Sequence, residues 1–149
     1  KNGKKITEKN ISKLINLSEN HELSEFVDSC LAKNVKKTTR ILNENNFNND
    51  DCIAITRIFL NKSKKILNLS KEFKKNNNID LTISSAKPPI FWKDKELVKE
   101  QIYNWSPEKI KKLIYELNEV ELLIKKNLNN SIKLITDFAL EQTSRKTNN

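Results

Sequence analysis

Few residues in this 149-residue chain are of the types that catalyse reactions or bind metals. His21 is the only histidine and stands in the polar segment SENHEL, where a solvated residue at a helix start is expected rather than a general base. Acidic pairs occur at Asp50–Asp51 and at Glu119 and Glu121. The first pair is better interpreted as the start of a long helix, where carboxylates offset the helix dipole. We therefore expect no catalytic site and no bound metal.

The glycine and cysteine contents argue against two further kinds of site. Gly3 is the only glycine in the chain, so a phosphate-cradling loop of the P-loop or Rossmann type is not expected here. Cys30 and Cys52 both fall in helical, mostly apolar patterns, and the sequence has no Cys-x-x-Cys pair. We expect no cofactor, and two reduced, buried thiols in a cytoplasmic protein.

The excess of lysine raises the question of nucleic-acid binding. The formal net charge is +9, and 25 Lys accompany only three Arg. Asn (22) and Ile (17) are also abundant, so part of the basicity agrees with an AT-rich genome. Lysines three or four residues apart can line a helix face that contacts phosphates, or can form a solvated face opposite an apolar stripe. The candidate lysines include Lys64, Lys65, Lys125 and Lys126.

Periodic apolar residues predict an all-α fold, a bundle of about six helices. Tight turns of a β-rich fold usually use Gly, whereas the connections here are rich in Asn, which tolerates left-handed backbone and caps helices. Helices are predicted from about residue 22, from 35 to about 45, from about 51 to 74, and from about 94, 107 and 131. The first two form an expected antiparallel hairpin. In the second, the buried stripe is expected at Val35, Thr38, Thr39 and Leu42.

Two helix starts are predicted from capping residues. In WSPEK, Ser106 is a good N-cap, Pro107 suits the first helical position, and Glu108 complements the helix dipole. Asp94 is expected to be the N-cap of the helix predicted from about residue 94.

The segment SAKPPIFWKDKE differs from the rest of the chain because it combines two prolines with adjacent aromatic residues. The prolines hold the backbone extended and exclude a helix just before the aromatics. We interpret the segment as a structural anchor that pins the crossover to the core, in preference to a binding loop. The expected anchor residues are Pro88, Pro89, Phe91, Trp92 and Trp105.

Four motifs follow one another from Ile6 to about Thr143. They are ITEKNISKLI, then LSEFVDSCLAKNVKKTTRILNEN, then AITRIFLNKSKKIL, and last AKPPIFWKDKELVKEQIYNWSPEKIKKLIYELNEVELLIKK. The last joins an aromatic segment, basic residues, a helix, a Trp-Ser helix start and a helix with an acidic-apolar-Lys end. In this order the motifs resemble the C-terminal part of the delta subunit of bacterial DNA polymerase III, a clamp-loader subunit. Arg57 matches a family arginine.

The resemblance implies a division into residues 1–20, the end of a lid domain, and residues 21–149, a C-terminal helical collar domain. The chain has no Met, even at position 1, so we expect a piece of a longer protein. In the family, the N-terminal domain opens the sliding clamp, the ATPase-like fold has no working ATP site, and the collar joins the tau/gamma and delta-prime subunits in a ring. The implied function is assembly of the clamp loader that places the sliding clamp on DNA during replication. The implied subunit is non-catalytic, although its holoenzyme is a nucleotidyltransferase.

The resemblance also bears on DNA contact. Relatives often have Gly where this chain has Lys33–Asn34 and Asn127–Asn130. Leu128 stands in the late loop, where an aromatic residue would be able to reach DNA, so only weak DNA contact is expected. Arg57 joins the four lysines as an interface or DNA-proximal candidate. The clamp itself would be bound only by the N-terminal domain.

Two other classes of function remain as alternatives. The chain can be a stand-alone basic helical module that binds nucleic acid, with an affinity that falls steeply with salt. It can also be a piece of an enzyme, although the sequence offers no catalytic constellation. No apolar run approaches the roughly 20 residues of a transmembrane helix, so we expect no membrane partner.

Overall fold

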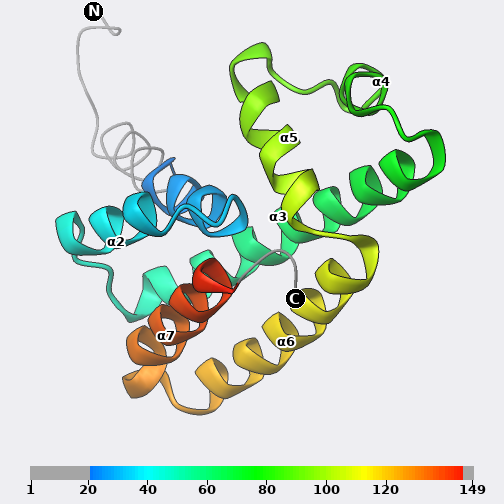
Figure 1. Ribbon diagram of the computed structural model, residues 1–149. Coiled ribbons are helices and arrows are strands. Elements are labelled where there is room, and N and C mark those ends of the chain that lie inside the picture. Colours follow the sequence, from blue (N-terminus) through cyan, green and yellow to red (C-terminus); the bar gives the residue numbers. More distant parts are fainter. Residues whose placement is uncertain (1–20, 146–149) are drawn as a thin grey trace, which may run out of the picture.

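The computed structural model describes residues 21–145, and every regular element in that range is helical. The all-α prediction is therefore confirmed. Residues 1–20, where the lid helix is predicted, and 146–149 lie outside the described residues. The α-helices of the described range are the segment 21–31, α2 (Val35–Glu44), α3 (Asn49–Asn76), α4 (Ile79–Ser84), α5 (Lys95–Asn104), α6 (Pro107–Lys126) and α7 (Ser131–Ser144), with short 3₁₀ turns η2 (Trp92–Asp94) and η3 (Leu128–Asn130) (Figure 1).

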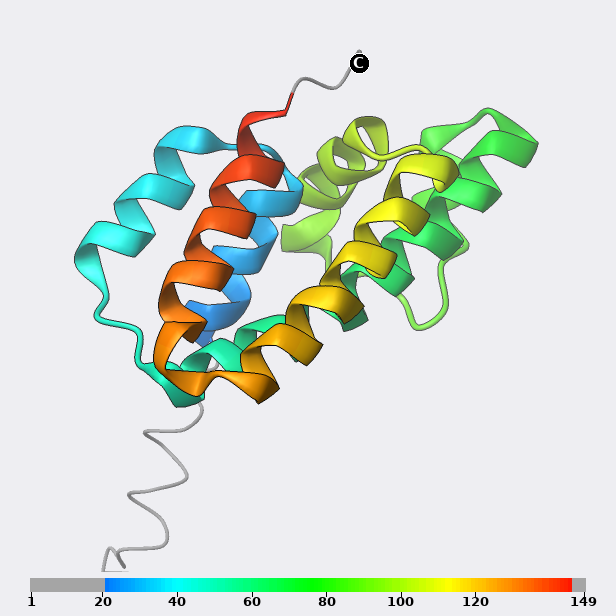
Figure 2. The same ribbon diagram turned by 90° about the horizontal axis from the view of Figure 1, so that it is seen from below.

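The long helix α3 is the axis of the fold. It packs most extensively against α6 and also contacts α4, α5 and α7. Figure 1 and Figure 2 show the segment 21–31, α2 and α7 gathered at one end of α3, and α4 and α5 at the other. The helix α6 runs antiparallel to α3, since Ser70 bonds Trp105 at one end and Asn49 bonds Ser131 at the other.

The buried faces agree with the sequence for the segment 21–31 and differ for α2. The apolar residues at helical spacing in the segment 21–31 are all buried: Leu23, Phe26, Val27, Cys30 and Leu31. In α2 the buried residues are Thr38 and Ile41, whereas Val35 is 49% exposed. The predicted stripe is therefore right at Thr38 and at Leu42, which packs partly buried against the core, and wrong at Val35 and Thr39, which are exposed. The cause is a polar contact, because the hydroxyls of Thr38 and Ser29 lie 2.9 Å apart in the interior and turn α2 toward the segment 21–31.

Asparagine begins and ends helices, as the Asn-rich connections predict. Asn48 and Asp51 form a reciprocal capping box at the start of α3, with N···O distances of 2.9 and 2.8 Å. Asn77 takes the left-handed conformation that ends α3 (φ 54°), and Asn78 caps α4. The helix α4 was not predicted, because the run of three asparagines at 76–78 is also typical of a loop.

The two helix starts predicted from caps have different outcomes. Ser106 accepts a hydrogen bond from the Lys109 N–H at 3.2 Å, and Pro107 is the first residue of α6, so this prediction is confirmed. Asp94 makes no side-chain capping bond. That prediction was wrong because η2 leads directly into α5, which gives Asp94 helical backbone angles instead of the extended ones of an N-cap.

Trp105 joins four helices at the centre of the fold. Its side chain is 4% exposed, and its indole Nε1 donates a hydrogen bond to the Leu31 carbonyl at the end of the segment 21–31 (2.8 Å). Its own carbonyl accepts from Ser70 Oγ of α3 (2.6 Å). Trp105 also ends α5 and directly precedes the N-cap of α6. The predicted anchor at Trp105 is confirmed by this burial.

The other half of the predicted anchor was wrong. Phe91 is 57% exposed and Trp92 is 69% exposed, and Pro88 and Pro89 are exposed as well. The rings of Phe91 and Trp92 lie 5.9 Å apart and pack on each other rather than on the core. The two rings therefore remain on the surface and do not pin the crossover to the core.

A pair of tryptophan variants tests this assignment. Trp105→Ala should lower the free energy of unfolding by about 3–5 kcal/mol, because it empties a buried site and leaves a buried carbonyl without its donor. Trp92→Ala should change it by less than about 0.5 kcal/mol. Urea denaturation followed by circular dichroism measures both values. Equal losses in the two variants would show that the anchor is misplaced.

The thiol of Cys30 gives a second test of the core. Burial raises its pKa from 9.0 to about 11. Between these pH values the unfolded chain loses the thiol proton and the folded chain keeps it, so the free energy of unfolding should fall by roughly 2–3 kcal/mol as pH rises. Cys30→Ala should lack this part of the pH dependence while sharing the contribution of the lysines. If the free energy of unfolding from urea denaturation falls equally steeply with pH in both proteins, the burial of the thiol is contradicted.

Candidate partner-binding surface

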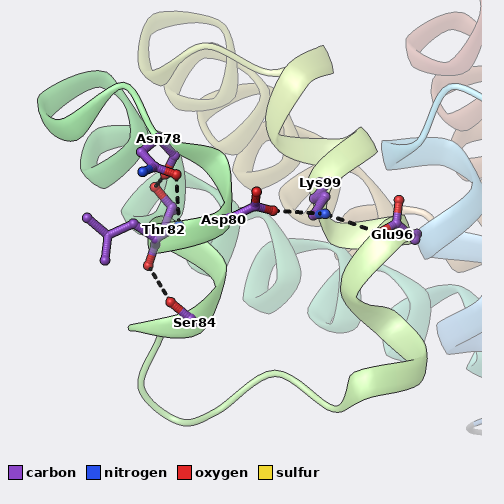
Figure 3. A network of polar contacts seen from close by, with 7 residues as sticks. Asn78, Asp80, Thr82, Ser84, Glu96 and Lys99 are labelled. Carbon is purple, nitrogen blue, oxygen red and sulfur yellow. Dashed lines mark hydrogen bonds and ion pairs between the residues drawn. The ribbon is translucent and has the colours of Figure 1, made fainter.

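The crossover from α4 to α5 is fixed at both ends by polar contacts. The Lys99 ammonium of α5 lies 3.1 Å from a carboxylate oxygen of Asp80 in α4 and 3.1 Å from one of Glu96 (Figure 3). Hydrogen bonds to Asp80 and then Glu96 raise the pKa of Lys99. Within α4, the Thr82 hydroxyl donates to the Asn78 carbonyl at 2.9 Å. The residues between α4 and α5 therefore connect two helices that are held together by the contacts of Lys99.

A groove of about 380 Å³ lies between the crossover and α3. Its polar end holds a part-buried ion pair, with Lys62 Nζ 3.1 Å from Asp28 Oδ1. Gln101 Nε2 donates to the Asp28 carbonyl at 3.1 Å and lies 3.3 Å from the Asp28 carboxylate. These polar groups satisfy one another, but Lys65, Asn68, Lys87 and Asp94 also line the groove, so a partner would meet polar side chains beside the apolar walls. The apolar lining residues include Ile66, Leu69, Pro88, Ile90, Leu97 and Val98.

The exposed pair Phe91 and Trp92, here named the crossover patch, stands beside this groove. Phe91 itself lines the groove. The Lys93 ammonium lies 5.4 Å from the centroid of the Trp92 ring, within the range of a cation–π contact. Exposed aromatics beside an apolar groove are typical of protein-binding surfaces, where Trp and Tyr anchors contribute most of the affinity.

A second exposed apolar surface, here named the corner patch, lies where α6 turns through η3 into α7. It lies at the opposite end of α3 from the crossover (Figure 1; Figure 2). The patch was not predicted from the sequence, although Leu122 and Leu123 fall outside the apolar stripe of α6 that contains Leu113, Leu117 and Ile124. Its residues are 42–55% exposed: Leu122, Leu123, Leu128 and Ile132.

The predicted basic residues are exposed but do not form one site. Arg57 lies in the first half of α3, and Lys64 and Lys65 lie in its second half. The antiparallel packing places Lys125 and Lys126, in the last turn of α6, near the start of α3. The Lys125 ammonium is 3.8 Å from a Glu121 carboxylate oxygen. Arg57 and Lys64 are seven residues apart on α3 and so share one face of that helix, Lys65 lines the groove, and Lys125 and Lys126 lie on α6.

Other kinds of site find no support in residues 21–145. No group of three or more His, Cys, Asp or Glu side chains in that range is arranged to hold a metal ion. Among the same residues, no helix has both the length and the apolar character needed to cross a membrane. Cys30 and Cys52 are free and buried, as predicted.

Comparison of the chain with protein-family models, with curated proteins and with solved structures found no match.

Proposed function

We propose that this chain is the C-terminal collar domain of a clamp-loader delta subunit. It assembles the loader by packing against the tau/gamma and delta-prime subunits. The order of the sequence motifs supports the family, and the two exposed apolar patches at opposite ends of α3 support the assembly role. That separation of the patches is the observation on which the proposal mainly rests.

A subunit inside a ring needs two separate interfaces, one for each neighbour. The crossover patch presents two aromatic side chains beside a groove, and the corner patch presents four aliphatic ones. Cores of protein interfaces are apolar and rich in aromatic anchors, whereas their rims are polar. The lysines around both patches would lie in such rims, where they steer association.

In this proposal the chain is a non-catalytic, cytoplasmic part of the replication machinery. The sliding clamp is bound by the N-terminal domain of the same subunit. Arg57 and the four exposed lysines make at most weak contacts with DNA, because they are divided between α3 and α6. The same proposal includes the architecture: the helical bundle is of the clamp-loader collar type.

A nucleic-acid-binding module is the second candidate, favoured by Lys93 against the exposed ring of Trp92. An exposed aromatic beside a cation can stack on a base while the lysine contacts the backbone. This candidate predicts DNA binding that weakens steeply as salt increases, because phosphate contacts release counterions. Measurement of DNA binding over a range of salt concentrations distinguishes the two candidates.

Patch variants test the assembly role. The double variant Phe91→Ala/Trp92→Ala and the double variant Leu122→Ser/Leu128→Ser should each weaken binding to one neighbour by at least about tenfold, since each removes exposed anchor side chains. Gel filtration and titration calorimetry with purified tau/gamma and delta-prime subunits measure this loss. Because the altered side chains are exposed, the folded state should keep its stability.

Tyr115→Ala is the matched control, because Tyr115 is 67% exposed on α6 and belongs to neither patch. It should bind as the parent chain does. The proposal fails if the parent chain migrates separately from both partners at about micromolar concentration. It also fails if the control loses as much affinity as the patch variants.

A further inference from the structure

A second cavity, of about 390 Å³, lies beside Trp105 and shares no lining residue with the crossover groove. Its walls come from the end of the segment 21–31, from α6 and from the end of α7. Four cationic side chains and one carboxylate line it, together with Trp105 and Gln142. The charged lining residues are Lys33, Lys109, Lys112, Glu116 and Arg145.

The cations of this cavity are held close enough to disfavour one another. Burial, followed by the positive charges of Lys109 and Arg145, lowers the pKa of Lys33. Glu116 and Glu141 offset part of the charge, with carboxylate oxygens 3.7 and 2.7 Å from the Arg145 guanidinium. Like charges are unfavourable at this range unless an anion lies between them.

Gln142 provides a hydrogen-bond donor without a protein partner. Its side chain is 1% exposed, and its amide Nε2 makes no hydrogen bond. A buried N–H without an acceptor is unfavourable. An oxygen atom of a bound anion in the cavity would accept this hydrogen bond.

The position of Lys33 is fixed by its backbone and by Trp105. The N–H groups of Lys33 and Asn34 bond the carbonyls of Cys30 and Ser29 at 3.0 Å, which is the Schellman ending of a helix. Lys33 takes the left-handed conformation there (φ 57°), a position that usually favours Gly. Its ammonium lies 4.6 Å from the centroid of the Trp105 ring and donates to the Arg145 carbonyl at 3.0 Å. The cation is therefore positioned before any ligand arrives.

We infer that this cavity is a binding site for a phosphate group, held by Lys33, Lys112 and Arg145 and by the amide of Gln142. A phosphate carries more than one negative charge and several acceptor oxygens, which fits converging cations and a free N–H. Charge-assisted hydrogen bonds to phosphate are stronger than neutral ones. The inference is independent of the proposed assembly role, because neither apolar patch contributes to the cavity.

Titration of the full chain with inorganic pyrophosphate at constant ionic strength tests the site. Binding should be saturable by calorimetry, and the melting temperature should rise with pyrophosphate concentration. Lys112→Gln should weaken the binding by about tenfold, because it removes one charged contact. Lys111→Gln is the matched control: it removes the same charge from the adjacent exposed position of α6, but Lys111 does not line the cavity.

Gln142→Leu separates the site from general attraction to a basic surface. It removes the unpaired N–H at similar volume, so the chain without anion should be as stable as the parent chain or more so, while pyrophosphate binding weakens. The inference is overturned if Lys111→Gln and Lys112→Gln weaken binding equally, or if Gln142→Leu leaves the affinity unchanged. Absence of saturable binding up to about 10 mM pyrophosphate would also overturn it.

A short single-stranded oligonucleotide, titrated in the same buffer, identifies the source of the phosphate. If its binding depends on Lys112 and Gln142 and competes with pyrophosphate, the site takes backbone phosphates of nucleic acid. If only pyrophosphate shows that dependence, the site takes a free phosphate compound. Dependence on neither residue for either probe overturns the inference.

Discussion

The fold depends on one buried indole. Trp105 donates to the last turn of the segment 21–31 and accepts from α3 through its carbonyl, and it stands between the end of α5 and the start of α6. The end of a helix leaves carbonyl groups without partners. Here Leu31 and Ala32 supply such carbonyls, which are bonded by Trp105 and Asn104. Packing and hydrogen bonding therefore coincide at a single side chain.

Trp105 also borders the basic cavity. Its ring centroid lies 4.6 Å from the Lys33 ammonium, and both residues line that cavity. The aromatic residues of the crossover contact each other instead, and they lie exposed beside a groove that has both apolar and polar walls. A structural residue thus also shapes one of the candidate binding surfaces.

Much of the fold could be predicted from sequence, because helix period and capping are local properties. The stripe of the segment 21–31, the start of α6 at Ser106 and the length of α3 follow from spacing and cap chemistry alone. The face of α2 could not be predicted, since it depends on a hydroxyl pair between helices. The exposure of Trp92 could not be predicted either, because it depends on which positions the packed helices leave open to the core. The cavity around Lys33 joins residues more than 100 positions apart in sequence, which no local pattern reveals.

Hydrogen–deuterium exchange of the chain, alone and bound to tau/gamma and delta-prime subunits, tests the central claim most directly. Assembly through the two patches predicts slower exchange of the backbone amides at 86–94 and at 122–132 in the complex, with the amides of the segment 21–31 unchanged. Protection confined to the exposed face of α3, or no protection at all, would contradict the account.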